Sequence, residues 1–143
     1  MSLTRREIRE KALQTLFQLA ANEDLSADQA MQQALTSHEE LADEVDRVAV
    51  PKYLELLTSG VTEHQAVIDA KIEENLANWS MKRLAKTDLM ILRIAIFEML
   101  YVTDVPAKVA LNEALEITKL YSDEKSRKFV NGVLAKVADE LAE

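Results

Sequence analysis

The sequence predicts an all-α protein, and three observations carry that prediction. Apolar residues recur at intervals of three and four along most of the 143-residue chain, which is the period of a helix buried on one face. The chain has 2 Gly and 2 Pro, too few for a sandwich or barrel, in which a turn signal recurs every ~8–12 residues. Its composition, 48% hydrophobic and 29% charged, suits one domain with a real core. We expect six or seven helices in one compact domain, in two sub-bundles of roughly residues 1–78 and 79–143.

Two capping motifs predict where the first helices begin. Thr4-x-x-Glu7 has the spacing of a capping box, in which both side chains bond to backbone N–H groups, and an apolar stripe follows it. Ser26-x-x-Gln29 has the same spacing and precedes a weaker stripe. We therefore expect one helix to start after Thr4 and a second to start after Ser26.

One long helix is expected to follow Pro51, because proline favours the first turn of a helix and the apolar residues after it keep a helical period. Gly60 lies inside this pattern and suits a close contact between helices. His64 is expected on the surface of the same helix. Trp79, near the expected junction of the two sub-bundles, is interpreted as a packing anchor.

The second half of the chain is expected to centre on one apolar helix. Residues 89–102 read LMILRIAIFEMLYV, which is too short to span a bilayer and carries two charges. We expect a buried helix there, capped by Thr87 or Asp88. A further helix is expected after Pro106 and a last one after Tyr121-Ser122-Asp123, where the serine is interpreted as a helix cap.

The composition argues against most enzyme classes. Without cysteine the chain has no disulfide, thiolate zinc site, iron–sulfur cluster or cysteine nucleophile. Two glycines cannot form a glycine-rich phosphate loop, and two histidines leave little for metal binding or general-base chemistry. We therefore expect no catalytic residue, no cofactor and no metal site. The N-terminus is charged and has no apolar signal region, so we expect a cytoplasmic protein that does not bind membranes.

The charge of the protein is unevenly distributed. The formal net charge is −8, and the segment from Glu23 to Arg47 has eight acidic residues against one arginine, a net charge of −7. Two short stretches are basic instead. The first basic island consists of Arg5, Arg6, Arg9 and Lys11, and the second of Lys119, Lys125, Arg127 and Lys128. Clustered cations in an acidic protein indicate local binding of a polyanion.

Four strings of residues, in order along the chain, carry a resemblance to a known family. They are RREIREKALQTLF at 5–17, LLTSGV at 56–61, the segment from Trp79 to Glu98, and DVP, NEA and KFVNGVL within 104–134. Together they resemble the NusB transcription antitermination family. The resemblance covers the chain except for about residues 22–50.

The resemblance implies an RNA-binding and protein-binding function. Members of this family pair with a small-subunit ribosomal protein, called NusE in this role. The pair binds the boxA element of nascent RNA and helps RNA polymerase to read through terminators, chiefly in ribosomal RNA operons. The expected partners are therefore boxA-type single-stranded RNA, NusE and the RNA polymerase antitermination complex, with a homodimer as a further expectation. The alternative is a helical protein–protein adaptor that does not bind RNA.

The three arginines of the first basic island are candidate RNA ligands. Arg5, Arg6 and Arg9 share a broad face of one helix by their spacing, and a guanidinium binds phosphate with a permanent charge. Spacing alone also allows a solvated first turn paired with Glu7 and Glu10. With the family resemblance, we assign all three arginines to RNA contact.

The second island combines cations with an aromatic ring, as single-stranded RNA sites do. The resemblance implies that its RNA surface joins the first helix to the start of the last one. Phe129 is interpreted as a base-stacking residue, although its spacing with Val133 and Val137 equally suits a core position. The candidate RNA-binding residues of this island are Lys125, Arg127, Lys128 and Phe129.

Several polar residues of the second half have two interpretations. Asp88 either faces the ribosomal-protein partner or caps its helix. Arg93 and Glu98 interrupt an apolar helix and are expected to pair with polar residues such as Asp88 or Asn112-Glu113, because buried charges need partners. Asn112-Glu113 is expected to be a buried polar pair, and Gly132 to permit close helix packing.

Overall fold

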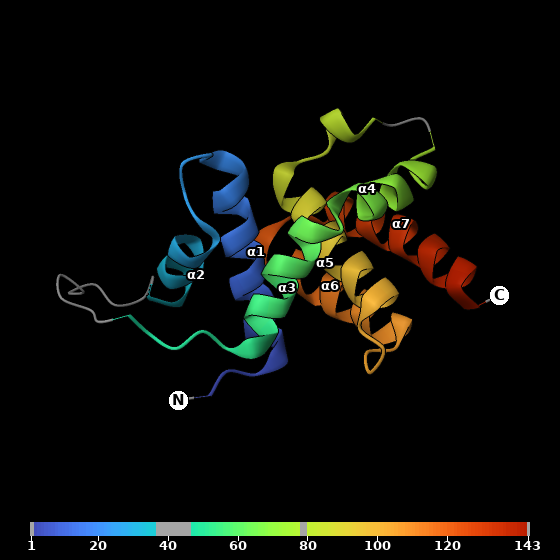
Figure 1. Ribbon diagram of the computed structural model, residues 1–143. Coiled ribbons are helices and arrows are strands. Elements are labelled where there is room, and N and C mark those ends of the chain that lie inside the picture. The colour runs from blue at the N-terminus through green and yellow to red at the C-terminus, as the bar shows by residue number, and fades with distance from the viewer. Residues whose placement is uncertain (1, 37–46, 78–79, 143) are drawn as a thin grey trace. The chain divides into compact units, whose positions relative to one another are not determined.

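The computed structural model describes residues 2–36, 47–77 and 80–142, and all the regular structure in these segments is helical (Figure 1). This confirms the predicted all-α class. The chain divides into two compact units, one up to Gly60 and one from Val61 onward, which are described separately. The elements are α1 (Arg5–Ala21), α2 (Ala27–Thr36), α3 (Lys52–Glu63), α4 (Gln65–Glu74), the 3-10 helix η1 (Met81–Arg83), α5 (Lys86–Tyr101), α6 (Ala107–Tyr121) and α7 (Glu124–Ala142).

Some expectations fall outside the described residues. These are the packing role of Trp79 and residues 37–46 of the acidic segment from Glu23 to Arg47, which include five of its eight acidic residues. Of that acidic segment, the structure describes the two ends. There Arg47 forms a two-pronged ion pair with Asp28, in which the guanidinium Nη2 lies 2.7 Å from Oδ1. The pairing lowers the pKa of the Asp28 carboxyl and raises that of Arg47, because each stabilises the charged form of the other.

The first unit contains both predicted capping boxes. Thr4 Oγ1 accepts the backbone N–H of Glu7 at 3.1 Å, and Glu7 Oε1 accepts the N–H of Thr4 at 2.9 Å. Ser26 and Gln29 exchange the equivalent bonds at 3.1 and 2.9 Å. The helices that follow these caps, α1 and α2, pack together. Their buried apolar side chains are Ile8, Ala12, Leu13, Leu16, Ala30, Met31 and Ala34.

The long helix predicted after Pro51 is in fact two helices, α3 and α4, which are interrupted at His64. The backbone of His64 (φ −106°, ψ 17°) leaves helical geometry. Its ring stacks on Tyr101 with the ring centroids 4.1 Å apart and lies 6.2 Å from Phe97. His64 is therefore half-buried against α5 rather than exposed on a continuous helix. The interruption places this ring beside two aromatic residues that are more than thirty positions away.

In the second unit, α5 is the central helix, as its composition predicts. Nine of its 16 residues are buried, and it packs against α4, α6 and α7. The predicted cap was wrong: the helix begins at Lys86 after Ala85, so Thr87 and Asp88 lie inside the first turn. Other buried apolar residues of this unit are Val61, Ile68, Ile72, Leu76, Val102, Val105, Ala110, Ala114, Ile117, Val130, Val133, Leu134 and Val137.

The predicted partners of Arg93 were also wrong, and so were the expectations for Asn112-Glu113 and Gly132. Arg93 pairs with Asp69 of α4, and its Nε and Nη2 each donate to one carboxylate oxygen at 2.9 Å. Asn112 is exposed and Glu113 half-buried, so they do not form a buried pair. Gly132 is exposed, and a Cβ built there would meet nothing within 4 Å. Close packing therefore does not explain this glycine.

Candidate nucleic-acid interface

The first basic island lies on the first two turns of α1. Arg5 and Arg6 are exposed, whereas Arg9 is 4% exposed and Lys11 is 9% exposed. The island therefore does not present all its cations on one open face. Arg9 and Lys11 flank the positions of α1 that enter the core, next to Ile8 and Ala12, and burial extends to them.

Tyr53, the second residue of α3, joins this island through its ring. The Cζ atom of Arg5 lies over the ring at 4.2 Å from its centroid, and that of Arg9 at 6.0 Å. Both distances are within the range of cation–π attraction. No sequence pattern indicates this residue, because nearly fifty positions separate it from Arg5 and only packing within the first unit brings them together.

Of the second island, Lys119 lies in the last turn of α6 and the other three cations lie on the first turns of α7. Helix α7 begins differently from the prediction. Asp123, not Ser122, caps the helix: its Oδ1 accepts the backbone N–H of Ser126 at 2.8 Å. This bond lowers the pKa of the Asp123 carboxyl, and the charge of Lys125 adds to the effect. Ser122 instead donates its hydroxyl to Asp88 Oδ1 at 2.9 Å and so ties the α6–α7 connection to the start of α5.

One surface pocket brings together two residues of the second island and Asp88, which was predicted for a separate reason. This pocket, here called the Phe129 pocket, has a volume of about 250 Å³ and is lined by Phe129, Lys125 and Asp88, together with Arg83, Leu84, Ala85, Asp123 and Ser126. Phe129 is half-buried, whereas Val133 and Val137 further along α7 are buried. The ring is therefore at the edge of the core with part of its surface in a charged pocket, which is compatible with stacking on a base.

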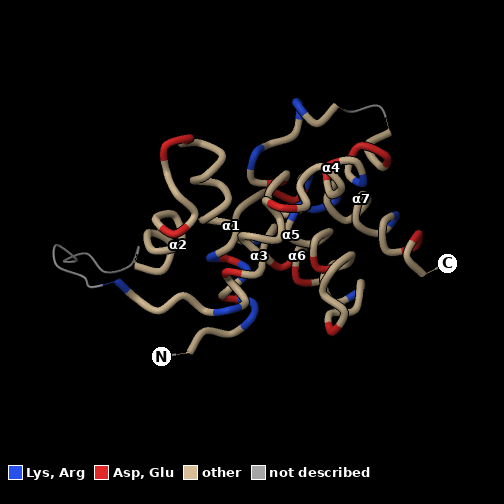
Figure 2. The backbone as a smooth tube through the Cα atoms, viewed as in Figure 1, with Lys and Arg blue, Asp and Glu red and all other residues tan. Residues whose placement is uncertain are grey.

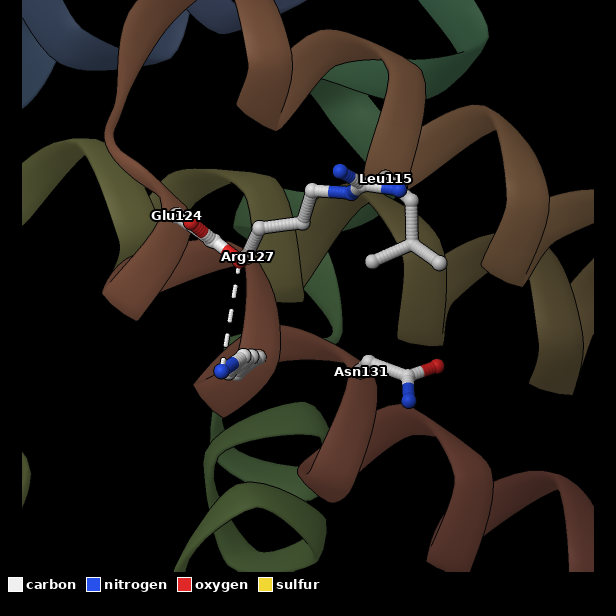
Figure 3. Close-up of a pocket in the computed structure, with 5 residues that line it drawn as sticks. Leu115, Glu124, Arg127 and Asn131 are labelled. Atoms are coloured by element: carbon white, nitrogen blue, oxygen red, sulfur yellow. Dashed lines mark ion pairs between the residues drawn. The ribbon is translucent and has the colours of Figure 1, made fainter.

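The other two cations of α7 line a second pocket, here called the Arg127 pocket. It has a volume of about 270 Å³ and is formed by Leu115, Glu124, Arg127, Lys128 and Asn131 (Figure 3). Lys128 Nζ lies 3.9 Å from Glu124 Oε1, and both side chains are about 80% exposed. An ion pair this long and exposed contributes little, so a phosphate can replace the carboxylate at small cost.

Helical spacing explains why the island divides between two pockets. Lys125 and Phe129 are four residues apart and lie on one side of α7, whereas Glu124, Arg127, Lys128 and Asn131 lie on the adjacent side. Both basic and acidic positions occur along the helices of each unit (Figure 2). Neither unit is therefore uniformly basic, and a positively charged site arises only where a few cations lie close together.

Arg83 lines the Phe129 pocket, although it belongs to neither of the predicted basic islands. A signal for it exists in the sequence. Lys82, Arg83 and Lys86 are three cations in a stretch without any acidic residue between Glu74 and Asp88. This third basic stretch is short, and η1 and the start of α5 bring it next to α7.

Metal-binding clusters and membrane spans are both absent from residues 2–36, 47–77 and 80–142. No group of three His, Cys, Asp or Glu side chains among these residues is arranged to hold a metal ion. None of the helices in these segments is both long and apolar enough to cross a membrane.

Comparison with known proteins supports one family. The model of the NusB family matches residues 6–139. The transcription antitermination protein NusB of Lactiplantibacillus plantarum is 56% identical over 143 residues and 99% of each chain, and that of Enterococcus faecalis is 56% identical over 141 residues, 97% of this chain and 92% of the other. The structure of T. maritima NusB superposes with a TM-score of 0.80 at 33% identity, over 98% of this chain and 94% of the other. A structure of the antitermination factors NusB and NusE in complex with dsRNA shares the fold, with a TM-score of 0.77 at 21% identity over 95% and 96% of the two chains. This chain therefore belongs to the NusB family of transcription antitermination proteins.

Proposed function

We propose that this protein is an RNA-binding antitermination factor that pairs with the ribosomal protein NusE, binds boxA-type single-stranded RNA and promotes read-through in ribosomal RNA operons. It acts by binding rather than by catalysis, in the cytoplasm, as part of the RNA polymerase antitermination complex. Membership of the family supports the general role. The proposed RNA sequence and partners come from the family resemblance.

The start of α7 is the observation that carries this proposal. Within five residues it presents three exposed cations, Lys125, Arg127 and Lys128, and a half-buried aromatic ring, Phe129. Phosphate contacts supply most of the affinity for a single strand, and bases stack on aromatic faces for ~1–3 kcal/mol each. One short helical segment thus provides both kinds of contact, with a pocket on each side.

The proposed roles follow from exposure and surroundings. Four cations are exposed and are therefore available to contact phosphates: Arg5, Arg6, Arg127 and Lys128. Arg9 is 4% exposed, so it adds positive potential behind Arg5 rather than an open phosphate site.

We propose that residues lining the Phe129 pocket contact both partners. Phe129 stacks on a base, and Lys125 holds the adjoining phosphate. Asp88 is 5% exposed and accepts the Ser122 hydroxyl, so its proposed contact with NusE is limited to the atoms that line the same pocket. RNA and NusE would then meet at the same end of α7, so each would strengthen the binding of the other. A homodimer that covered this surface would compete with RNA.

The test is a titration of labelled boxA-type RNA with the protein, in the presence and absence of NusE, at several salt concentrations. The variant Arg5→Ala/Arg6→Ala removes two proposed phosphate contacts, and Lys108→Ala/Lys136→Ala removes the same charge from exposed positions outside the islands. We expect the arginine variant to weaken binding and to reduce the slope of log affinity against log salt by about 0.7 for each phosphate that is no longer bound. The lysine control should keep nearly the full slope.

Three results would contradict parts of this function. Equal slopes for the two variants would remove α1 from the RNA surface. Binding of NusE without any RNA binding would favour the protein–protein adaptor. Binding of RNA that NusE does not strengthen would leave an RNA-binding protein that does not act as a pair.

A further inference from the structure

The contact between Arg5 and Tyr53 points to a role beyond packing. The guanidinium carbon of Arg5 lies over the ring at 4.2 Å from its centroid, well within the ~6 Å range of cation–π attraction, while that of Arg9 lies at 6.0 Å from the same centroid. Arg5 and Arg9 are four residues apart, so α1 presents both cations to the side where Tyr53 lies. Arg5 is exposed and Tyr53 half-buried, which places this contact at the protein surface.

An aromatic ring under an arginine changes how well that arginine binds a phosphate. A free arginine side chain loses rotamer entropy when it is fixed. A ring that already restricts the side chain removes part of this cost before the ligand arrives. The contact does not block binding, because the N–H donors of a guanidinium lie in its own plane and a phosphate approaches them at the edge.

We propose that Tyr53 is a positioning residue for RNA binding, which holds the Arg5 guanidinium in place for a phosphate of the RNA backbone and, with Arg9 beside it, concentrates positive charge there. This inference rests on the proposed RNA-binding function. Tyr53 acts through Arg5 and is not itself a phosphate ligand. It is not a stacking platform for a base on the face that Arg5 covers, because the guanidinium occupies that face.

The ring of Tyr53, rather than its hydroxyl group, is the part that holds the Arg5 guanidinium. Tyr53→Phe keeps the aromatic face and should bind labelled boxA-type RNA, in the presence of NusE, within about twofold of the unchanged protein. Tyr53→Leu removes the face and should bind about two- to fivefold more weakly, the factor that corresponds to an exposed cation–π contact. The salt slope of Tyr53→Leu should stay unchanged, because the number of phosphate contacts is the same.

A double-mutant cycle with Arg5 separates positioning from a general loss of structure. Once Arg5→Ala is present, Tyr53→Leu should cause no further loss of affinity, since the group that it positions is gone. Tyr101→Leu is the matched control. It removes a ring that is 39% exposed and stacks on His64 and Phe97 instead of on a cation, and it should not change RNA affinity. Circular dichroism and melting temperature establish that each variant is folded.

The other possible results of these affinity measurements each contradict either the role of Tyr53 or the role of α1 in RNA binding. If Arg5→Ala weakens binding and folded Tyr53→Leu does not, Tyr53 has no positioning role, although the proposed function stands. If Tyr53→Phe loses as much affinity as Tyr53→Leu, the hydroxyl contacts RNA directly and the inference is wrong. If Tyr53→Leu does not fold, Tyr53→Met replaces it in the comparison, because methionine keeps a long, adaptable apolar side chain without the aromatic face. Affinity equal to that of the unchanged protein would then overturn the inference. If neither Arg5→Ala nor Tyr53→Leu has an effect, α1 is not part of the RNA surface and both proposals fail there.

Discussion

Substitution of Phe129 by leucine separates two roles that its position at the edge of the core allows. Leucine keeps a large apolar side chain but removes the flat aromatic face. Phe129 is half-buried and lines the Phe129 pocket beside Lys125, so part of the ring packs and part faces the pocket. The two parts predict different measurements, RNA affinity for the exposed face and melting temperature for the packed one.

The magnitudes follow from this partial burial. Loss of stacking on one base costs ~1–3 kcal/mol when the ring is truncated to alanine. Leucine retains some apolar contact, so we expect about 1–2 kcal/mol, or roughly 5- to 30-fold in affinity. An apolar exchange of similar volume at a half-buried site should cost less than about 1.5 kcal/mol of stability, and the melting temperature should fall by no more than a few degrees.

The assay measures affinity for labelled boxA-type RNA with NusE present, and thermal unfolding of the same samples. Val133→Ala is the control, because Val133 is one turn further along α7 and 3% exposed. It should reduce the free energy of unfolding by about 1–3 kcal/mol and leave the RNA affinity of the folded protein unchanged. If Phe129→Leu behaves like this control, with a large melting loss and normal RNA binding, Phe129 belongs to the core and the stacking role is refuted.

Three further predictions concern charges. Asp69→Asn should lower the free energy of unfolding, measured by chemical denaturation, by about 2 kcal/mol. This value lies between those of exposed and buried ion pairs, because the Arg93 and Asp69 side chains are 12% and 22% exposed. A coupling energy near zero in a double-mutant cycle of Arg93→Met and Asp69→Leu would contradict it. The backbone N–H of Ser126 donates to the Asp123 carboxylate and lowers the pKa of folded Asp123 below the ordinary 3.8. The stability that this bond adds is therefore complete above pH 3.8 and is lost as the pH falls through the folded pKa. Asp123→Asn should flatten the fall of the melting temperature in acid, and an unchanged pH profile would exclude this contribution. Neutralising part of the acidic segment should raise binding to random RNA more than binding to boxA-type RNA, because acidic residues repel polyanions that approach in unproductive orientations. An equal rise in both would exclude this role in specificity. The neutralised residues are Asp43, Glu44 and Asp46.

The sequence by itself determined the features that depend on neighbours three or four positions away. Both capping boxes were predicted with the correct partners, because the bonds join residues within one helical turn. The central position of α5 followed from apolar residues on nearly all its sides, which only a buried helix tolerates. The family was also evident from short strings such as KFVNGVL at residues 128–134, whose order along the chain needs no structure.

Tertiary structure alone decided the contacts between segments far apart in the chain. The apolar period from Pro51 onward does not reveal the interruption at His64, because the period is nearly continuous and the stacking partners belong to α5. A buried charge indicates that it needs a partner but not which one, so Arg93 was assigned to the wrong residues.

The candidate site shows the same division. Spacing placed Arg5 and Arg9 on one face of α1, but packing made one exposed and the other buried and set the ring of Tyr53 against both. Lys125 and Phe129 were predicted together as one island and Asp88 for a separate reason, and the fold placed all three in one pocket. Helical periodicity fixes the direction in which a side chain leaves its own helix, whereas the group that it meets depends on which other helix packs there.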